Sequence, residues 1–230
     1  MSTDAGAAAH AGTAVNAERR AAVVAGVLFL VTEVAAIAGA ALYRPLLGGG
    51  PGADNRALIG ALCELVLVAA VAGTGVTLFP VVKRWGEGLA LGYLCARLLE
   101  AAVILLGIVA VLALTTVRRE AAQPGATAAD AALVAVHDWT FLVGPNIILG
   151  LNTALLAWLM YRSRLVPRPI AVLGLVGGPL ICASAAAVMF GLYAQLSVPG
   201  SLAALPVFAW EVALAVRLIV RGFGRTRGSD

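Results

Sequence analysis

Residues 89–117, LALGYLCARLLEAAVILLGIVAVLALTTV, form a long apolar stretch that contains one arginine and one glutamate, Arg97 and Glu100. About 20 mostly apolar residues are enough for a helix to cross the hydrocarbon core of a bilayer, so this stretch predicts a membrane-spanning helix. The two charged side chains lie three residues apart, which places them on one face of that helix. A buried charged pair needs neighbouring helices to cover it, and the rest of the chain predicts such neighbours.

The composition excludes a soluble globular domain. Of the 230 residues, 61% are hydrophobic and 12% are charged, against roughly 45–50% and 25% in soluble domains. So few polar groups cannot cover so much apolar surface, and the lipid bilayer is therefore the partner that we expect. The net charge of +4 comes from basic residues in short loops rather than from one basic stripe, so we expect no nucleic-acid partner.

Six apolar stretches are long enough to span a membrane, and together they predict an all-α membrane protein, a six-transmembrane-helix bundle. The segments between them have helix-breaking chemistry: a glycine-rich run with a proline at 48–52, Pro80, which we expect to close the second span, and Pro124 with Gly125. The expected spans are residues 21–42, 57–79, 89–117, 131–160, 170–193 and 204–220.

Local signals predict where two helices begin and where two bend. Thr127 followed three residues later by Asp130 is a capping-box pattern, and Pro169 suits the first turn of the next helix. Pro145 and Pro179 lie mid-span, where each leaves the carbonyl four residues earlier without its donor, so we expect a kink at both. Small residues recur every four positions and predict close helix packing. These are Gly88, Gly92 and Ala96; Asn146, Gly150 and Ala154; and Gly174 and Gly178.

The basic residues predict the orientation of the bundle. If the six spans cross the membrane in alternating directions, the loops and termini on one side of it carry Arg19, Arg20, Lys83, Arg84, Arg162, Arg164, Arg168, Arg221, Arg225 and Arg227. The other side carries only Arg44, Arg56, Arg118 and Arg119. By the positive-inside rule both termini are cytoplasmic, in a multi-pass protein of the cell membrane. We expect a disordered cytoplasmic tail over residues 1–20, the transmembrane domain over 21–223 and a basic cytoplasmic tail over 224–230.

Ionisable side chains lie deep inside five of the expected spans. A rise of about 1.5 Å per residue places the acids and the histidine roughly 16–20 Å from the cytoplasmic boundary. The arginine lies somewhat closer to that boundary. The sequence thus predicts one polar layer in the outer half of the membrane. An intramembrane ionisable residue is a candidate functional residue. The candidate ligand or proton site comprises Glu33, Glu64, Arg97, Glu100, His137, Asp138 and Glu211.

The acids of this layer outnumber its cations. An ionised carboxylate in hydrocarbon costs roughly 2.5–3.5 kcal/mol on insertion scales. Arg97 and a protonated His137 supply at most two positive charges for five acids, so some carboxyls must be protonated, face water or bind a cation. A structural interpretation explains part of the layer, because Arg97 and Glu100 can neutralise each other and His137 with Asp138 can mark the membrane interface.

Three stretches carry a resemblance to a known family: EGLALGY at 87–93 running on to Arg97 and Glu100, VHDWTFLVGP at 136–145, and YRSRLVPR at 161–168. In these three stretches the chain resembles the bacterial multi-pass membrane proteins of domain-of-unknown-function family 4386. The resemblance covers about residues 21–223. It implies an integral membrane protein and assigns no activity or catalytic residue.

The sequence leaves three functions open. The first is proton- or cation-coupled handling of a small molecule, with Glu64, Glu100 and Glu211 as proton or cation sites and Arg97 as their counter-charge. Six helices are few for a monomeric carrier, and a homodimer would remove that objection. The second is an intramembrane enzyme, or a metal- or lipid-binding protein, that uses the same acids with His137. The third is a structural or accessory subunit whose polar layer only fixes helix register.

Sequence motifs for common cofactors do not occur in the chain. It has no Walker sequence, no H-E-x-x-H and no pair of Glu-x-x-His units. We therefore expect no cofactor and no resident metal. Whether the protein is an enzyme is left open by the sequence.

The topology is directly testable. A reporter fused after Gly228 is expected to be active as a cytoplasmic fusion, and one inserted at Pro124 as an external fusion, because the arginine-rich loops stay inside. Alkaline phosphatase and green fluorescent protein fusions at both positions measure this. The reverse pattern would contradict the predicted orientation.

Overall fold

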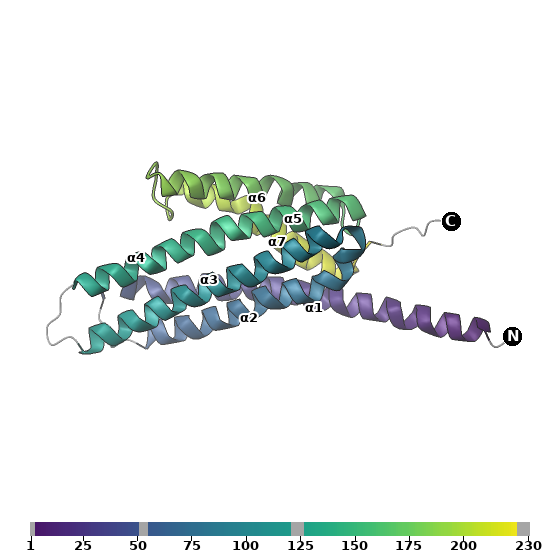
Figure 1. The fold of residues 1–230 in the computed structure, drawn as a ribbon, viewed down its shortest axis with the longest axis horizontal. Helices are drawn as coiled ribbons and strands as arrows, with labels where there is room; N and C mark the ends of the chain where they lie inside the picture. Colours follow the sequence, from purple (N-terminus) through teal and green to yellow (C-terminus); the bar gives the residue numbers. More distant parts are fainter. Residues whose placement is uncertain (1–2, 51–54, 121–126, 225–230) are drawn as a thin grey trace.

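The computed structural model describes residues 3–50, 55–120 and 127–224, with side chains described from Asn16 onward. These residues form helices and turns, and no strand occurs among them (Figure 1). In chain order the elements are α1 (Thr3–Leu47), α2 (Arg56–Val82), the 3₁₀ helix η1 (Lys83–Trp85), α3 (Glu87–Glu120), α4 (Ala128–Leu142), the π-helix η2 (Val143–Ile148), α5 (Leu149–Ser163), α6 (Arg168–Met189) and α7 (Val198–Arg221).

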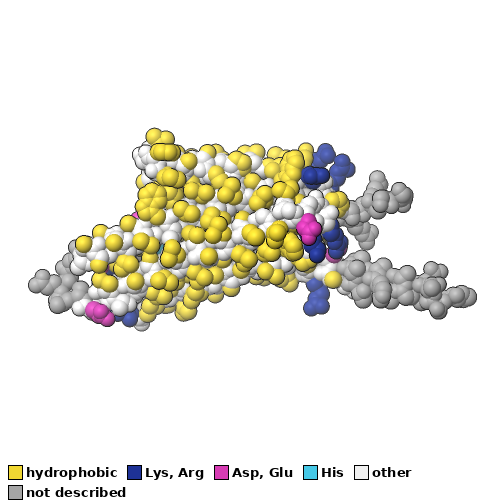
Figure 2. Space-filling view, viewed as in Figure 1, with side chains coloured by type: hydrophobic (Ala, Val, Ile, Leu, Met, Phe, Trp, Pro, Cys, Tyr) yellow, Lys and Arg dark blue, Asp and Glu magenta, His cyan; other side chains and the backbone are white. Residues whose placement is uncertain are grey.

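Six helical spans are long and apolar enough to cross a membrane, which confirms the predicted fold class. The fourth span is one continuous rod of α4, η2 and α5. Apolar side chains cover the middle of the molecule, and Lys and Arg gather at one end of it (Figure 2). We call this the basic end; it holds Arg84 and Arg168, next to the short connections that follow α2 and α5. That the basic end is cytoplasmic stays a prediction.

Several helix boundaries differ from the predicted ones, and two of the differences have a local explanation. α2 continues past Pro80 to Val82, because a proline in the last turn removes only one hydrogen bond of a helix that is about to end. α6 ends at Met189 rather than at residue 193. Gly191 adopts a φ of 74°, and the Leu192 N–H donates to the Ala187 carbonyl at 3.0 Å, which together form a Schellman stop.

α1 begins at Thr3, within the segment for which the sequence predicts disorder. A nucleated helix extends at little cost through residues of high helix propensity, and this segment is rich in alanine. The Arg19 guanidinium also donates to the carbonyls of Leu218 at 2.9 Å and Ile219 at 2.7 Å. Arg19 thereby caps α7 and ties the start of the first span to the end of the last. Residues 51–52, Pro124 with Gly125, and residues 225–230 of the predicted tail lie outside the described residues.

The predicted start signals of the later helices are confirmed. The Thr127 hydroxyl accepts the Asp130 N–H at 3.1 Å at the start of α4, and Pro169 lies in the first turn of α6. The Asp130 carboxylate also pairs with Arg118 of α3 at 3.3 Å. Arg118 in turn donates to the Leu46 carbonyl at the end of α1. One arginine thus joins three helices at the end of the bundle opposite the basic end.

The helices form a ring that α7 closes by packing against α1. At the basic end all six spans contribute to one apolar cluster, which includes Phe29 and Trp210. Towards the opposite end a second cluster, which includes Tyr43 and Ile108, joins α1, α2 and α3. The outer part of the α6–α7 hairpin belongs to neither cluster, and Phe190 at its tip is 81% exposed. Figure 1 shows this hairpin diverging from the other helices at that end.

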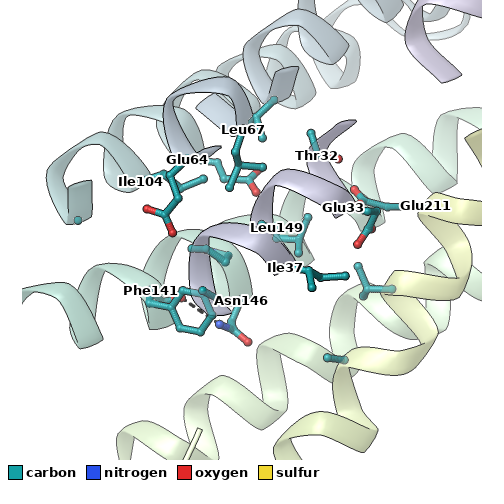
Figure 3. A pocket seen from close by; sticks show the side chains of 18 of the residues that line it. Thr32, Glu33, Ile37, Glu64, Leu67, Ile104, Phe141, Asn146, Leu149 and Glu211 are labelled. Carbon is teal, nitrogen blue, oxygen red and sulfur yellow. Dashed lines mark hydrogen bonds between the residues drawn. The ribbon is translucent and has the colours of Figure 1, made fainter. Parts of the chain in front are cut away.

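Pro145 changes the helix type within the fourth span. The proline lacks the N–H that would bond to the Phe141 carbonyl, and the helix widens to the π form over Val143–Ile148. The Asn146 side-chain amide donates to that carbonyl at 3.0 Å (Figure 3). The next residue thus replaces the donor that the proline lacks, while the kink itself stays a prediction. α6, by contrast, continues through Pro179 as an α-helix.

Two of the three small-residue stripes pack closely. A Cβ added at Gly150 would lie 2.6 Å from the Gly178 carbonyl oxygen, and one at Gly174 would lie 2.7 Å from the Trp210 ring. The stripe on α3 behaves differently, because a Cβ at Gly88 would meet nothing within 4 Å. The α5–α6 contact therefore depends on glycine, and the start of α3 does not.

This difference predicts opposite effects of the same substitution. Gly150→Ala should destabilise the protein by roughly 1–3 kcal/mol, because backbone atoms of α6 must move. Gly88→Ala should leave the stability unchanged or slightly higher, because alanine favours the helix. Thermal unfolding of both variants in detergent measures the comparison. Equal melting temperatures would contradict the close α5–α6 packing.

Candidate functional site

A cavity of about 320 Å³ lies among the helices between the two apolar clusters (Figure 3). Apolar side chains provide most of its wall, and the polar side chains come from every span except the one formed by α6. Six of the seven residues predicted from the sequence line it, and Asp138 does not. The polar and ionisable lining residues are Thr32, Glu33, Glu64, Arg97, Glu100, His137, Thr140, Asn146 and Glu211.

Arg97 is the central cation of the cavity. Its Nη1 donates to Glu100 Oε2 at 3.2 Å on the same helix, and its Nη2 donates to Glu211 Oε1 of α7 at 2.7 Å. All three side chains are buried. The sequence predicted Arg97 as the counter-charge of Glu64, Glu100 and Glu211; the structure has ion pairs of Arg97 with Glu100 and Glu211 and none with Glu64. One guanidinium thereby ties α3 to α7 across the bundle.

The surroundings of Arg97 exclude water from the side away from the acids. The guanidinium carbon lies 5.2 Å from the centre of the Phe29 ring and 5.8 Å from that of Tyr93, within the range of cation–π attraction. Gly75 of α2 faces the start of the side chain, and a Cβ there would lie 3.1 Å from the Cβ of Arg97. The missing side chain at Gly75 gives the arginine room to lie between α2 and α7.

Glu100 is held by a third helix as well. The side-chain amide of Asn152 on α5 donates to Glu100 Oε2 at 2.6 Å, the same oxygen that accepts from Arg97. Asn152 is fully buried, and its Oδ1 has no hydrogen-bond partner among the described residues. Asn152 is thus an interhelical hydrogen-bond donor between α5 and α3. Its hydrogen bond to Glu100 was not predicted, because the separation of two residues along the chain does not show whether their side chains meet.

Glu33 and Glu211 lie next to each other on one side of the cavity (Figure 3). Glu33 comes from α1 and is only partly buried, while Glu211 is 5% exposed. Two carboxylates in contact repel each other when both are ionised. Arg97 is bonded to Glu211 and not to Glu33, so Glu33 lacks a direct cation partner among the described residues.

Glu64 lies on the other side of the cavity and is 7% exposed. Gly39 of α1 makes room for it, because a Cβ there would lie 2.7 Å from the Cγ of Glu64. The phenol of Tyr43 on α1 is a polar neighbour of Glu64. Glu64 forms no ion pair with any described residue. It is therefore a buried carboxyl that the fold positions but does not neutralise.

His137 and Asp138 point in different directions. His137 is buried in the cavity wall, with its ring edge-on to Tyr43 at 5.7 Å and stacked on Phe141 at 6.3 Å between centres. The Asp138 side chain is 65% exposed and lies outside the cavity, 3.4 Å from the Nδ1 of His137. The sequence predicted both as members of the candidate site. Only His137 faces it, because successive residues of a helix point about 100° apart.

Tyr43 was not identified from the sequence. It lies at the end of the first expected span, next to Arg44, where a tyrosine is typical of the membrane interface. In the structure its ring is 1% exposed and packs over Gly60 of α2, between Glu64 and His137. The glycine on the neighbouring helix is the only sequence signal that could have indicated this position.

The chemistry of the cavity follows from its charges. One guanidinium faces four carboxyls, and two of these, Glu33 and Glu64, have no direct cation partner among the described residues. Those residues contain no group of three or more His, Cys, Asp or Glu side chains arranged to hold a metal ion. The arrangement is suited to binding or exchanging a single positive charge, whether a proton or a cation.

The family model described as Domain of unknown function (DUF4386) matches residues 24–222. The chain belongs to this family. The match contains all three stretches on which the resemblance was noted, and it contains every residue of the cavity wall. No curated protein and no solved structure matches the chain. As a member of DUF4386 with six apolar spans, the protein is a multi-pass membrane protein.

The Arg97 contacts of this DUF4386 protein predict a large loss of stability on substitution. Arg97→Leu should destabilise it by about 3–5 kcal/mol, because Glu100 and Glu211 would lose their shared cation. Adding Glu211→Gln to Arg97→Leu should recover part of this loss, and more of it than adding Glu100→Gln, since the Glu211 contact is shorter. Unfolding of the single and double variants in detergent gives the coupling.

The exposed pair of Arg84 and Glu18 at the basic end is the matched control. Arg84→Leu should cost at most about 1 kcal/mol, as is usual for exposed ion pairs. If the losses of Arg97→Leu and Glu211→Gln add without coupling, the two side chains do not interact in the membrane.

Proposed function

We propose that the protein handles a small molecule in the membrane, coupled to the binding and release of protons or cations at the carboxyls of the cavity. The observation that carries this proposal is the excess of carboxyls over cations in a cavity buried among the spans. Each ionised carboxylate that lacks a partner is costly in such a setting, so a proton or a cation has to balance it.

The distribution of charge supports coupling rather than a purely structural layer. Arg97 already donates to two acids, Glu100 and Glu211, and these three side chains form one ion-paired unit between α3 and α7. Glu33 and Glu64 add two acids that this unit does not need. If the polar layer only fixed helix register, glutamine in place of Glu33 and Glu64 would make the same interhelical hydrogen bonds without burying an ionisable group.

The packing supports access from one direction. The apolar cluster at the basic end closes the bundle on that side of Arg97, whereas the α6–α7 hairpin diverges on the other side. The π-helical segment at Val143–Ile148 lies in the cavity wall, and π segments often occur at functional sites. In this proposal the cavity opens towards the outer half of the cell membrane.

The alternatives find less support. A metal-dependent intramembrane hydrolase would need a metal site, and no described cluster of His, Cys, Asp and Glu is arranged to hold a metal. His137 is a single imidazole whose ring contacts are with Tyr43 and Phe141. A structural subunit explains Arg97, Glu100 and Glu211 but gives no reason for an unneutralised Glu64.

The proposal predicts that individual carboxyls exchange protons in the folded protein. Carboxyl infrared bands of purified protein should change between about pH 5 and 9, where a working acid must titrate. Glu64→Gln and Glu33→Gln should each remove part of that change while the variant stays folded, because glutamine keeps the shape and cannot titrate. Proton flux into liposomes that contain either variant should fall to the level of empty liposomes.

Asp138→Asn is the control, because this acid lies at a similar depth but outside the cavity. Its infrared change and proton flux should match those of the wild type. If no carboxyl band changes over the pH range, or if Asp138→Asn abolishes the flux as Glu64→Gln does, the cavity carboxyls do not couple to protons.

A further inference from the structure

We infer that the molecule handled at this cavity is an amphiphilic cation, a hydrophobic group with one positive charge, which enters from the lipid between α1 and α7. This inference deepens the proposed function and rests on it. It depends on three features of the cavity: the side through which it opens, the character of its wall and the sign of its charge.

The side opening lies one helical turn beyond the Glu33–Glu211 contact. Ile37 of α1 and Phe208 of α7 both line the cavity, and they are 61% and 42% exposed on the surface of the bundle. Because Ile37 and Phe208 belong both to the cavity wall and to the lipid-facing surface, the cavity reaches that surface between them. α1 and α7 pack closely nearer the basic end, where a Cβ at Gly26 would lie 2.8 Å from the Ala215 carbonyl. The gap therefore exists only in the part of the bundle away from the basic end.

The wall of the cavity is suited to a hydrophobic group. Its apolar lining includes Leu67, Val71, Ile104, Leu149 and Val207. Ligand cavities of this size typically have apolar walls with a few polar groups that fix orientation. A strongly hydrated ion or a sugar would lose its hydration against these side chains and gain few hydrogen bonds. The wall thus favours a ligand that is already soluble in the lipid.

The charge of the cavity favours a cation. Arg97 is bonded to Glu100 and Glu211, so an anion would meet a cation that is already compensated twice. Glu64 is more than nine-tenths buried, lines the cavity and has no ion pair with a described residue, so it presents a charge or a proton to whatever occupies the space. Phe141 also lines the cavity, and aromatic rings attract cations at their faces. A positive group between Glu64 and the Glu33–Glu211 contact would supply the missing counter-charge.

Two probes of equal shape and opposite charge test this inference. Purified protein is dialysed to equilibrium against radiolabelled tetraphenylphosphonium or tetraphenylborate, with empty detergent micelles as the background. Tetraphenylphosphonium should bind saturably, and tetraphenylborate should show only the background partition. Saturable binding of tetraphenylborate that is equal or tighter would overturn the inference, and so would the absence of saturable binding of tetraphenylphosphonium.

Variants locate the binding. Glu64→Gln should weaken tetraphenylphosphonium binding about tenfold or more, the effect of losing one charge-assisted contact. Asp138→Asn and Glu87→Gln are matched controls outside the cavity and should bind as the wild type does. If Glu64→Gln does not fold, the partly exposed Glu33→Gln should show the weakened binding instead. Unchanged binding in folded Glu64→Gln and Glu33→Gln would overturn the inference.

The side opening has a test of its own. Ile37→Trp should slow the association of tetraphenylphosphonium, because a larger side chain narrows the gap between α1 and α7. Val34→Trp is the control, since Val34 is 69% exposed on α1 but does not line the cavity. Equal association rates in both variants would overturn entry between α1 and α7.

Failure of this inference differs from failure of the proposed function. Carboxyl-dependent proton flux without binding of tetraphenylphosphonium would overturn the cationic ligand and leave proton coupling in place. Glu64-dependent binding of tetraphenylphosphonium without any proton flux would support the cationic ligand and overturn proton coupling.

Discussion

The ion pairs of Arg97 with Glu100 and Glu211 constrain the rest of the bundle. A buried guanidinium is tolerated only where acids neutralise it, so α3 must turn this residue towards α7 when the helices assemble. Asn152 binds the same carboxylate as Arg97 and thereby fixes the rotation of α5. Gly75 leaves room on α2 for the arginine. The rotations of four of the six spans thus follow from one side chain, and the cavity is the space that their polar faces enclose.

The same constraint explains why the cavity is acidic. Arg97 satisfies one acid of its own helix and one of α7, and it is the only cation of the described cavity wall. α1 and α2 bring Glu33 and Glu64 to the same level without a second arginine. The bundle stays open there because the α6–α7 hairpin packs on α1 only near the basic end and then diverges. The two carboxyls without an ion-pair partner, Glu33 and Glu64, therefore line the part of the bundle that side chains leave unfilled.

The sequence predicted that ionisable residues of five spans lie at one level of the bundle, but it could not predict which side chains contact each other. Span length and residue rise require no knowledge of neighbouring helices, so six of the seven predicted residues meet at one cavity. Rotation about each helix axis depends on packing. For this reason Asp138 faces away while His137 faces inward, and the sequence could not show which of Glu64, Glu100 and Glu211 would bond directly to Arg97. Caps such as Thr127 and the freed carbonyl before Pro145 are local and were predictable. The helix stop at Met189 depends on a glycine conformation that the apolar pattern of α6 did not indicate.

The structural and the functional interpretation of the polar layer differ most at Glu64. Ion pairs that hold helices together place opposite charges in contact, as Arg97 does with its two acids. Glu64 has no such contact, although Gly39 on the facing helix is shaped to admit its side chain. A fold that needed only a polar group there would be equally stable with an amide, which carries no charge to bury. In the proposed function the acid at this position gains and loses a positive charge while the protein works, which is the physical reason to look for a proton or a cationic ligand at this cavity.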